Sequence, residues 1–173
     1  MLAYRIKLLN RLLANYRGKV ISEEIKISKI SPESKVLFIG CGLLPSTPIR
    51  ISKETNAHVT AIEHSSKIVH IARSFINKNG LSNKIKIEIG NGINYPVEQF
   101  DVIFIATNVW PITSVLKHLS SNMKTNSRLI CRDIKNDIQK ILEHEGLNDI
   151  LPIETAFIHP AGSKYKSLLI VKK

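Results

Sequence analysis

From Ser34 to the C-terminus, short segments rich in β-branched residues alternate with segments of helical spacing. Parallel strands cannot be joined by a tight turn, so this alternation predicts a parallel sheet with helices as crossover connections. Two strand-like segments in succession, Ile153–Ile158 and Ser167–Val171, break the order near the end and predict an antiparallel β-hairpin at one edge. The expected fold class is α/β: a doubly wound, mostly parallel, seven-stranded sheet of Rossmann-like type.

The other elements follow from apolar periodicity and from glycine and proline positions. Strands are predicted at Lys35–Ile39, His58–Ile62, Ile85–Ile89, Val102–Ala106 and Arg128–Arg132. Helices are predicted at Pro48–Thr55, Ser65–Asn79, Ile112–Ser121 and Ile134–Glu145, with Thr47 as the N-cap of the first. Because Val102–Ala106 is wholly apolar, we expect it in the centre of the sheet.

The segment before the sheet has a different character. Leu2–Tyr16 places apolar side chains at helical spacing and predicts an N-terminal amphipathic helix packed on the domain. Residues 1–33 are interpreted as a helical N-terminal extension. Since no repeat or linker interrupts the chain, residues 1–173 are interpreted as a single domain. The same helix is a candidate contact for a homo-oligomer or a partner subunit.

Composition excludes several classes of protein. No apolar run approaches the roughly 20 residues that span a bilayer, so no membrane partner is expected. Arg5, Lys7 and Arg11 interrupt the N-terminal apolar stretch, which argues against a secretion signal and favours a cytoplasmic protein. Cys41 and Cys131 lack metal-site spacing, and no metal is expected. The net charge of +11 has two open interpretations, RNA binding or a composition bias of the source organism.

The first chemical motif is the strand Val36–Ile39 running into Gly40-Cys41-Gly42. A buried strand that opens into Gly-x-Gly lets the backbone turn sharply and approach a ligand at the carboxyl end of the sheet. Pro45 and Ser46 stand where a dinucleotide-binding loop would carry its third glycine, which argues against a pyrophosphate site. A plain tight turn remains the alternative.

An acidic residue, Glu63, closes the next predicted strand roughly 20 residues after the glycines. A carboxylate at this place can accept hydrogen bonds from both ribose hydroxyls of a nucleoside cofactor. His64 follows directly and either borders the cofactor or is exposed to solvent. Alone, Glu63 would be a solvated loop residue, but its pairing with the glycine turn favours the functional interpretation.

Two later loops add candidates. Gly90-Asn91-Gly92-Ile93 follows the third strand and is either an adenine contact or a turn without a ligand. Thr107-Asn108-Val109-Trp110 follows the central strand, where Asn108 is a candidate substrate contact. Trp110 is either a stacking surface for the substrate or a core anchor for the next helix. Asp101, which opens that strand, is interpreted as a solvated or capping carboxylate.

Together these motifs resemble the successive cofactor motifs of class I S-adenosylmethionine-dependent methyltransferases. The resemblance spans Ser34 to the C-terminus and implies S-adenosylmethionine as the cofactor. It places the methionine arm at Gly40, Gly42 and Leu43 and the ribose at Glu63, and it places adenine at Asn91 and Ile93. It brings the sulfonium to Ala106–Asn108. The complete set of expected cofactor contacts is Gly40, Cys41, Gly42, Leu43, Glu63, His64, Asn91, Gly92, Ile93, Ala106 and Thr107.

The glycine loop also has a more specific likeness. Gly40-Cys41-Gly42 continues into Leu43-Leu44-Pro45-Ser46-Thr47, which is similar to the loop of nicotianamine synthases. Those enzymes transfer the aminocarboxypropyl arm of the cofactor instead of its methyl group. The similarity is local and extends to Phe100–Asn108 and Arg132. That family has a substantial helical N-terminal domain, whereas only about thirty residues precede the sheet here.

Three functions are open at this point, and no catalytic residue is identified. The first is a methyltransferase acting on a small molecule or on RNA. The second is a nicotianamine-synthase-like aminocarboxypropyl transferase. The third is a non-catalytic subunit that binds a partner through the Leu2–Tyr16 helix. Because an activated sulfonium needs little beyond alignment with a nucleophile, the cofactor half of such a site leaves stronger sequence signals than the catalytic half.

Overall fold

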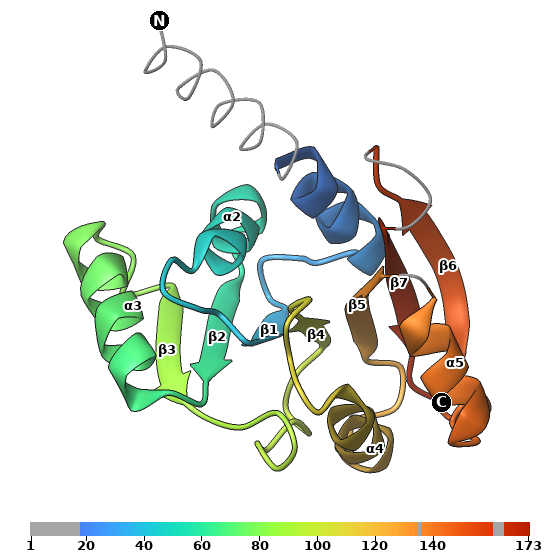
Figure 1. Ribbon diagram of the computed structural model, residues 1–173. Helices are drawn as coiled ribbons and strands as arrows, with labels where there is room; N and C mark the ends of the chain where they lie inside the picture. The colour runs from blue at the N-terminus through green and yellow to red at the C-terminus, as the bar shows by residue number, and fades with distance from the viewer. Residues whose placement is uncertain (1–17, 135, 161–164) are drawn as a thin grey trace, which may run out of the picture.

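The computed structural model describes residues 18–134, 136–160 and 165–173. A seven-stranded sheet runs through the centre in the order β3-β2-β1-β4-β5-β7-β6 (Figure 1). The strands are β1 Lys35–Ile39, β2 His58–Glu63, β3 Ile85–Ile89, β4 Val102–Ile105, β5 Arg128–Ile134, β6 Ile153–Ile158 and β7 Tyr165–Val171. The first five are parallel to one another, and β7 is antiparallel to both β5 and β6.

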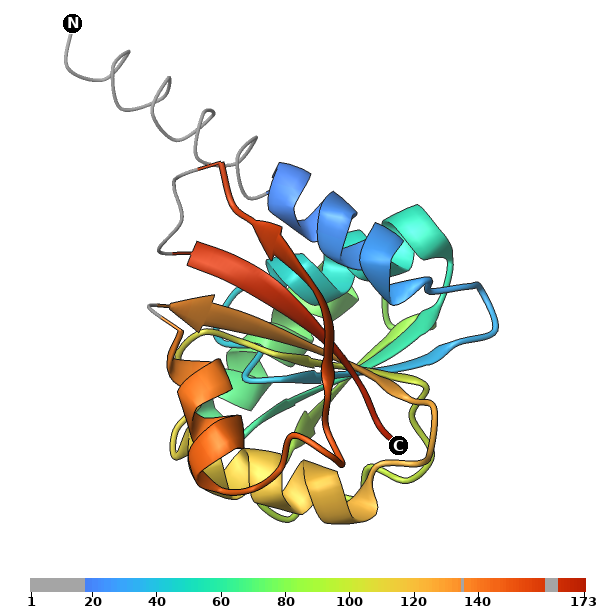
Figure 2. The same cartoon turned by 90° about the vertical axis from the view of Figure 1, so that its right-hand side faces the viewer.

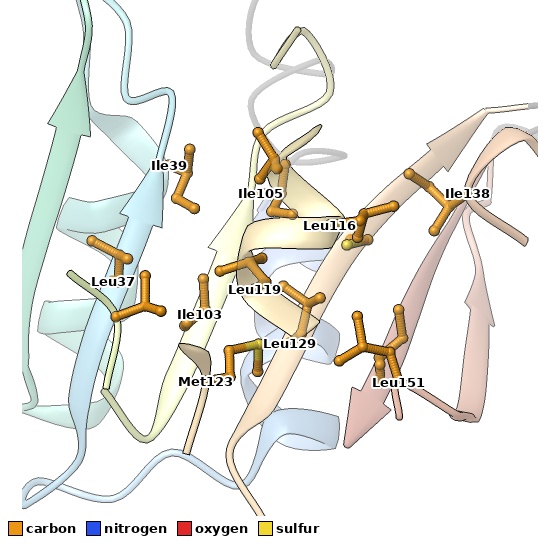
Figure 3. Packing of buried hydrophobic residues seen from close by; sticks show 14 of the residues in the cluster. Leu37, Ile39, Ile103, Ile105, Leu116, Leu119, Met123, Leu129, Ile138 and Leu151 are labelled. Carbon is orange, nitrogen blue, oxygen red and sulfur yellow. The ribbon is translucent and has the colours of Figure 1, made fainter. Parts of the chain in front are cut away.

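Helices cover both faces of the sheet, as Figure 2 shows for the helix over residues 18–28 and α2 on one side and α4 and α5 on the other. The labelled helices are α2 Ser46–Thr55, α3 Ser66–Lys78, α4 Ile112–Asn122 and α5 Asp137–His144. Two apolar clusters result. One packs α4 and α5 against β1, β4 and β5 (Figure 3), and the other packs α2, α3 and the 18–28 helix against the opposite face.

The predicted fold class is confirmed, including the central position of β4 and the terminal hairpin. All four residues of β4 are buried, as its wholly apolar composition requires. Instead of extending the parallel order, β7 inserts between β5 and the edge strand β6. The Leu2–Tyr16 prediction lies outside the described residues. The Ile-rich stretch that follows it forms the helix over residues 18–28.

Two helix starts were predicted wrongly. Helix α2 begins at Ser46, two residues earlier than predicted, so Thr47 lies inside its first turn and does not cap it. Helix α5 begins at Asp137, because Ile134 continues β5 and pairs with Tyr165 of β7. At α5 the long-range pairing of β5 with β7 decided the boundary, which local propensity does not encode.

Within the described residues, no helix is long and apolar enough to cross a membrane. The same part of the chain contains no group of three or more side chains suited to hold a metal ion.

Candidate functional site

A cavity of about 700 Å³ opens at the carboxyl ends of β1, β2, β3 and β4. The chain leaves β1 for β2 on one side and returns to β4 on the other, so the strand order reverses beside β1. In open α/β sheets the loops diverge at such a point and leave a crevice for a ligand. The topology therefore accounts for the position of the cavity.

The cavity contains nearly every residue predicted for the site. All but Leu43 and Ile93 lie on its wall, namely Gly40, Cys41, Gly42, Glu63, His64, Asn91, Gly92, Ala106, Thr107, Asn108 and Trp110. Leu43 and Ile93 are 50% and 38% exposed and lie outside the lining. Their contact with a cofactor stays a prediction.

The glycine turn forms the part of the wall that follows β1. Gly40 has a φ of 84° and Gly42 a φ of 64°, a left-handed conformation that glycine adopts without steric cost. A Cβ on Gly40 would lie 2.8 Å from Cγ2 of Val109, so the loop after β4 packs directly on the bare backbone. The amides of Gly40 and Cys41 both donate to the Ile62 carbonyl, at 2.9 and 3.1 Å. The turn is thereby held against the end of β2.

Glu63 ends β2 on the same wall, and its side chain is only 9% exposed. Its Oε2 accepts a hydrogen bond from the Gly42 amide at 3.3 Å, and its Oε1 accepts one from the His64 amide at 3.0 Å. The imidazole Nδ1 of His64 lies 2.8 Å from the same Oε1, on a side chain that is 79% exposed. The carboxylate is thus buried, oriented by backbone donors and next to the glycine turn.

Asn91 and Gly92 close the cavity beyond the end of β3. Oδ1 of Asn91 accepts a hydrogen bond from the Ile93 amide at 3.2 Å, so the side chain stabilises its own turn. A Cβ on Gly92 would lie 2.8 Å from Cγ2 of Ile39, and this close approach explains the second glycine of the Gly-Asn-Gly sequence.

The loop after β4 carries Ala106 to Trp110 along the cavity. Trp110 is 86% exposed, so its interpretation as a core anchor is wrong. It stands at the rim of the cavity instead, where an indole ring has a face available for stacking. Asp101 opens β4 at the opposite end of the strand, where its Oδ2 accepts a hydrogen bond from the Lys35 amide at 2.7 Å. It acts as the capping carboxylate that was expected.

Cys41 lies on the cavity wall without the properties of a nucleophile. Burial, together with the neighbouring Glu63 carboxylate, raises the pKa of its thiol to about 12. The reactive form of a cysteine is the thiolate. Cys41 is therefore a small packing residue at neutral pH.

Several lining residues had no place among the predicted contacts. Leu44, Ser46, Thr47 and Pro48 bring the first turn of α2 to the cavity, and Arg132 reaches it from the end of β5. Helix α2 has neither a side-chain cap nor an acidic residue in its first turn. A helix N-terminus of this kind favours an anionic group. The similarity of the Leu44–Thr47 sequence to a known loop was the signal that pointed to this segment.

A second cavity of about 550 Å³ adjoins the first, and the two share Ser46, Thr47, Thr107 and Arg132. Arg132 donates through Nε and Nη2 to the two carboxylate oxygens of Glu24, at 2.8 and 2.7 Å. Glu24 belongs to the helix over residues 18–28 and is completely buried. The sequence alone does not distinguish Glu24 from the adjacent Glu23. The ion pair between Glu24 and Arg132 could therefore not be predicted from it.

Comparison with known proteins gives a family and a fold. The family model described as "Nicotianamine synthase protein" matches residues 14–173. L-histidine 2-aminobutanoyltransferase of Yersinia pestis is 26% identical over 112 residues, which cover 65% of this chain and 42% of that protein. The chain therefore spans less than half the length of this relative.

Solved structures agree on the fold. A mutant of MtNAS in complex with S-adenosylmethionine superposes with a TM-score of 0.75 at 22% identity, covering 89% of this chain and 60% of that one. An RNA methyltransferase from Salinibacter ruber in complex with S-adenosyl-L-homocysteine has a TM-score of 0.71 at 10% identity, covering 90% and 92%. The fold is that of the class I S-adenosylmethionine-dependent methyltransferases.

Proposed function

The chain belongs to the nicotianamine synthase family, and from this premise we propose that it transfers the aminocarboxypropyl group of S-adenosylmethionine to an amine. The proposal depends mainly on one observation: the Leu44–Thr47 continuation, which distinguishes the loop from that of an ordinary methyltransferase, lies beside the glycine turn and supplies Leu44, Ser46 and Thr47 to the cavity wall. The family-specific part of the loop thus borders the space in which the transferred arm would lie.

The residues of the first cavity fit the cofactor. The bare backbone at Gly42, where an added Cβ would have no atom within 4 Å, leaves space for the methionine arm, and the uncapped first turn of α2 suits its carboxylate. Glu63 presents a buried carboxylate for the ribose hydroxyls. Asn91 lies on the cavity wall beyond the end of β3, where it would contact the adenine. Ala106 and Thr107 line the cavity where they would border the sulfonium, whose positive charge makes each of its three bonded carbons open to nucleophilic attack.

The transfer needs an amine whose lone pair is directed at the methylene carbon next to sulfur. As the nitrogen–carbon bond forms, the carbon–sulfur bond breaks and its electron pair returns to sulfur. The products are methylthioadenosine, which is neutral at sulfur, and an aminocarboxypropyl amine that has released one proton. Holding the two reactants in line accounts for much of the rate enhancement of such a displacement.

The relative from Yersinia pestis is described as acting on L-histidine. We therefore choose L-histidine as the first acceptor to test, followed by the other free amino acids. Methyl transfer to a small molecule or to RNA is the competing function, since the fold is shared with methyltransferases.

Product analysis separates these functions. The full chain is incubated with S-adenosylmethionine, with and without L-histidine, and the nucleoside products are quantified by mass spectrometry. Methylthioadenosine that depends on the acceptor supports the proposal. S-adenosylhomocysteine would show methyl transfer instead. If neither product forms and S-adenosylmethionine does not bind in calorimetry, the chain is a non-catalytic subunit of this fold.

A further inference from the structure

A chain of hydrogen-bonded polar side chains runs along the second cavity and joins β5, the helix over residues 18–28, β7 and the end of β6. It begins at Arg132 of β5, which is paired with Glu24. Ser167 of β7 donates its hydroxyl proton to Oε1 of Glu24 at 2.6 Å. The same Ser167 Oγ lies 2.8 Å from Nε2 of His159, the residue that follows β6. None of these contacts involves a residue that is proposed to hold the cofactor.

The order of donors assigns the tautomer of His159. Glu24 faces the Arg132 guanidinium with both oxygens, and as a carboxylate it can only accept hydrogen bonds. The single proton of the Ser167 hydroxyl must therefore point to Glu24. Ser167 Oγ can then only accept from the imidazole, which places the proton of the neutral ring on Nε2. Nδ1 is left with an unprotonated lone pair.

His159 lines the second cavity although it is only 8% exposed. Within the described residues, Nε2 of its imidazole is bonded to Ser167 and Nδ1 has no hydrogen-bond partner. An imidazole with a basic nitrogen thus stands on the wall of a cavity that adjoins the cofactor cavity.

We propose that the second cavity binds the acceptor amine and that His159 is the general base, with Nδ1 taking the proton that the attacking amine releases. This inference rests on the proposed function. Ser167 and Glu24 are positioning residues: they hold the imidazole in one tautomer and stabilise the imidazolium that forms. The acceptor reaches the cofactor through the junction of the two cavities at Thr47, Thr107 and Arg132.

The proton balance is complete within this arrangement. The acceptor ammonium first gives one proton to Nδ1 and becomes the neutral amine. The neutral amine donates its lone pair to the methylene carbon, the carbon–sulfur electron pair passes to sulfur, and the product keeps its nitrogen as a secondary ammonium. The imidazolium then keeps its Nε2–H directed at Ser167, which is bonded to the negative Glu24, and finally loses its extra proton to water.

The surroundings of His159 favour the neutral imidazole, which is the form that can accept a proton. Burial lowers the pKa of the imidazole, the Glu24 carboxylate opposes this shift, and the Arg132 guanidinium reinforces it. Asp133 and Tyr165 also line the cavity, and Lys166 Nζ lies 3.7 Å from the Asp133 carboxylate. A group with a lowered pKa is neutral at and above neutral pH. Turnover should therefore fall as the pH drops through the folded pKa of His159.

The first test replaces His159 with glutamine, whose amide nitrogen can still donate to Ser167 but which has no basic atom. We expect kcat for methylthioadenosine formation with L-histidine to fall by about 100-fold or more in His159→Gln. The Kd of S-adenosylmethionine should stay unchanged, and the acidic limb of the pH profile should disappear. His144→Gln is the matched control, because the side chain of His144 is 87% exposed.

A second test does not depend on turnover. Nitrogen NMR of the wild-type imidazole should show a protonated Nε2 and an unprotonated Nδ1 for His159, and Ser167→Ala should remove this preference. A wild-type ring protonated on Nδ1 would overturn the proposal even if His159→Gln failed to fold.

The outcomes distinguish a failure of the proposed transfer reaction from a failure of the general-base role of His159. Wild-type protein that forms no methylthioadenosine with any amine overturns the proposed function and the role of His159 with it. Wild-type protein that forms methylthioadenosine, together with a folded His159→Gln variant of equal kcat and equal pH profile, overturns the general base alone.

Discussion

Gly40 and Gly42 have the same left-handed backbone conformation but different surroundings. A Cβ on Gly40 would meet Val109 Cγ2 at 2.8 Å, whereas a Cβ on Gly42 would have no atom within 4 Å. The sequence pattern Gly-x-Gly predicts a turn for both glycines but cannot distinguish their packing. The two positions therefore form a natural pair for separating backbone strain from steric exclusion.

We predict that Gly42→Ala lowers the free energy of unfolding by about 1–2 kcal/mol, the cost of a left-handed alanine. Gly40→Ala should cost more, because the added methyl group also displaces Val109. Urea denaturation of both variants measures the difference. An equal decrease in the free energy of unfolding for the two variants would show that the contact with Val109 does not affect stability.

Glu63 is the residue at which sequence and structure agree most closely. Its place at the end of the second strand was predicted, and the structure places its carboxylate on the cavity wall next to Gly42. Its contact with ribose remains a prediction. Sequence could not foresee that backbone amides already orient the carboxylate, because those amides belong to turns whose geometry is set by packing.

We expect Glu63→Gln to raise the Kd of S-adenosylmethionine by about 10- to 100-fold, since a hydrogen bond to a charged group contributes about 1.5–3 kcal/mol. Isothermal titration calorimetry measures this change. Glu98→Gln serves as the control at an exposed glutamate. An unchanged Kd in Glu63→Gln would remove the ribose role of this residue.

At the level of elements, the helix over residues 18–28 is tied to the sheet by a buried ion pair. Glu24 is fully buried and bonded to Arg132 and Ser167, while its neighbour Glu23 keeps 41% of its side chain exposed. Removing one partner of a buried ion pair leaves the other charge buried without compensation. The resulting loss of stability exceeds the stability that the intact pair contributes.

Glu24→Gln should therefore lower the free energy of unfolding by about 3–5 kcal/mol. The matched variant Glu23→Gln, one residue away, should change it by less than about 0.5 kcal/mol. Chemical denaturation followed by circular dichroism compares the two. Similar stability in both variants would mean that the buried pair does not hold the helix to the sheet.

For the whole molecule, the two cavities and the sheet form one binding unit, since the walls of the first cavity come from the loops after four strands. A ligand that joins these loops binds only the folded chain. It must stabilise the fold by mass action.

We predict that S-adenosylmethionine at 100 times its Kd stabilises the protein by about 2.7 kcal/mol and raises Tm by about 5–10 °C. Differential scanning fluorimetry tests this, with adenosine monophosphate as a nucleotide control. The shift should shrink in Glu63→Gln at the same ligand concentration. No shift in the wild-type protein at any concentration would contradict the cofactor site.

The sequence by itself determined the order of strands and helices, the terminal hairpin and the positions of the glycine turn and Glu63. These features depend on local periodicity and on residues next to one another in the chain, such as the apolar run of β4 and Gly40-Cys41-Gly42. Only the tertiary structure decided that Trp110 is exposed, that Thr47 lies inside α2, and that Glu24, Arg132, Ser167 and His159 form one hydrogen-bonded chain. Those four residues are spread over most of the chain, and they meet because β7 inserts between β5 and β6 while the N-terminal helix packs across the sheet. Contacts of this kind come from the pairing of distant segments, which leaves no periodic signal in the sequence.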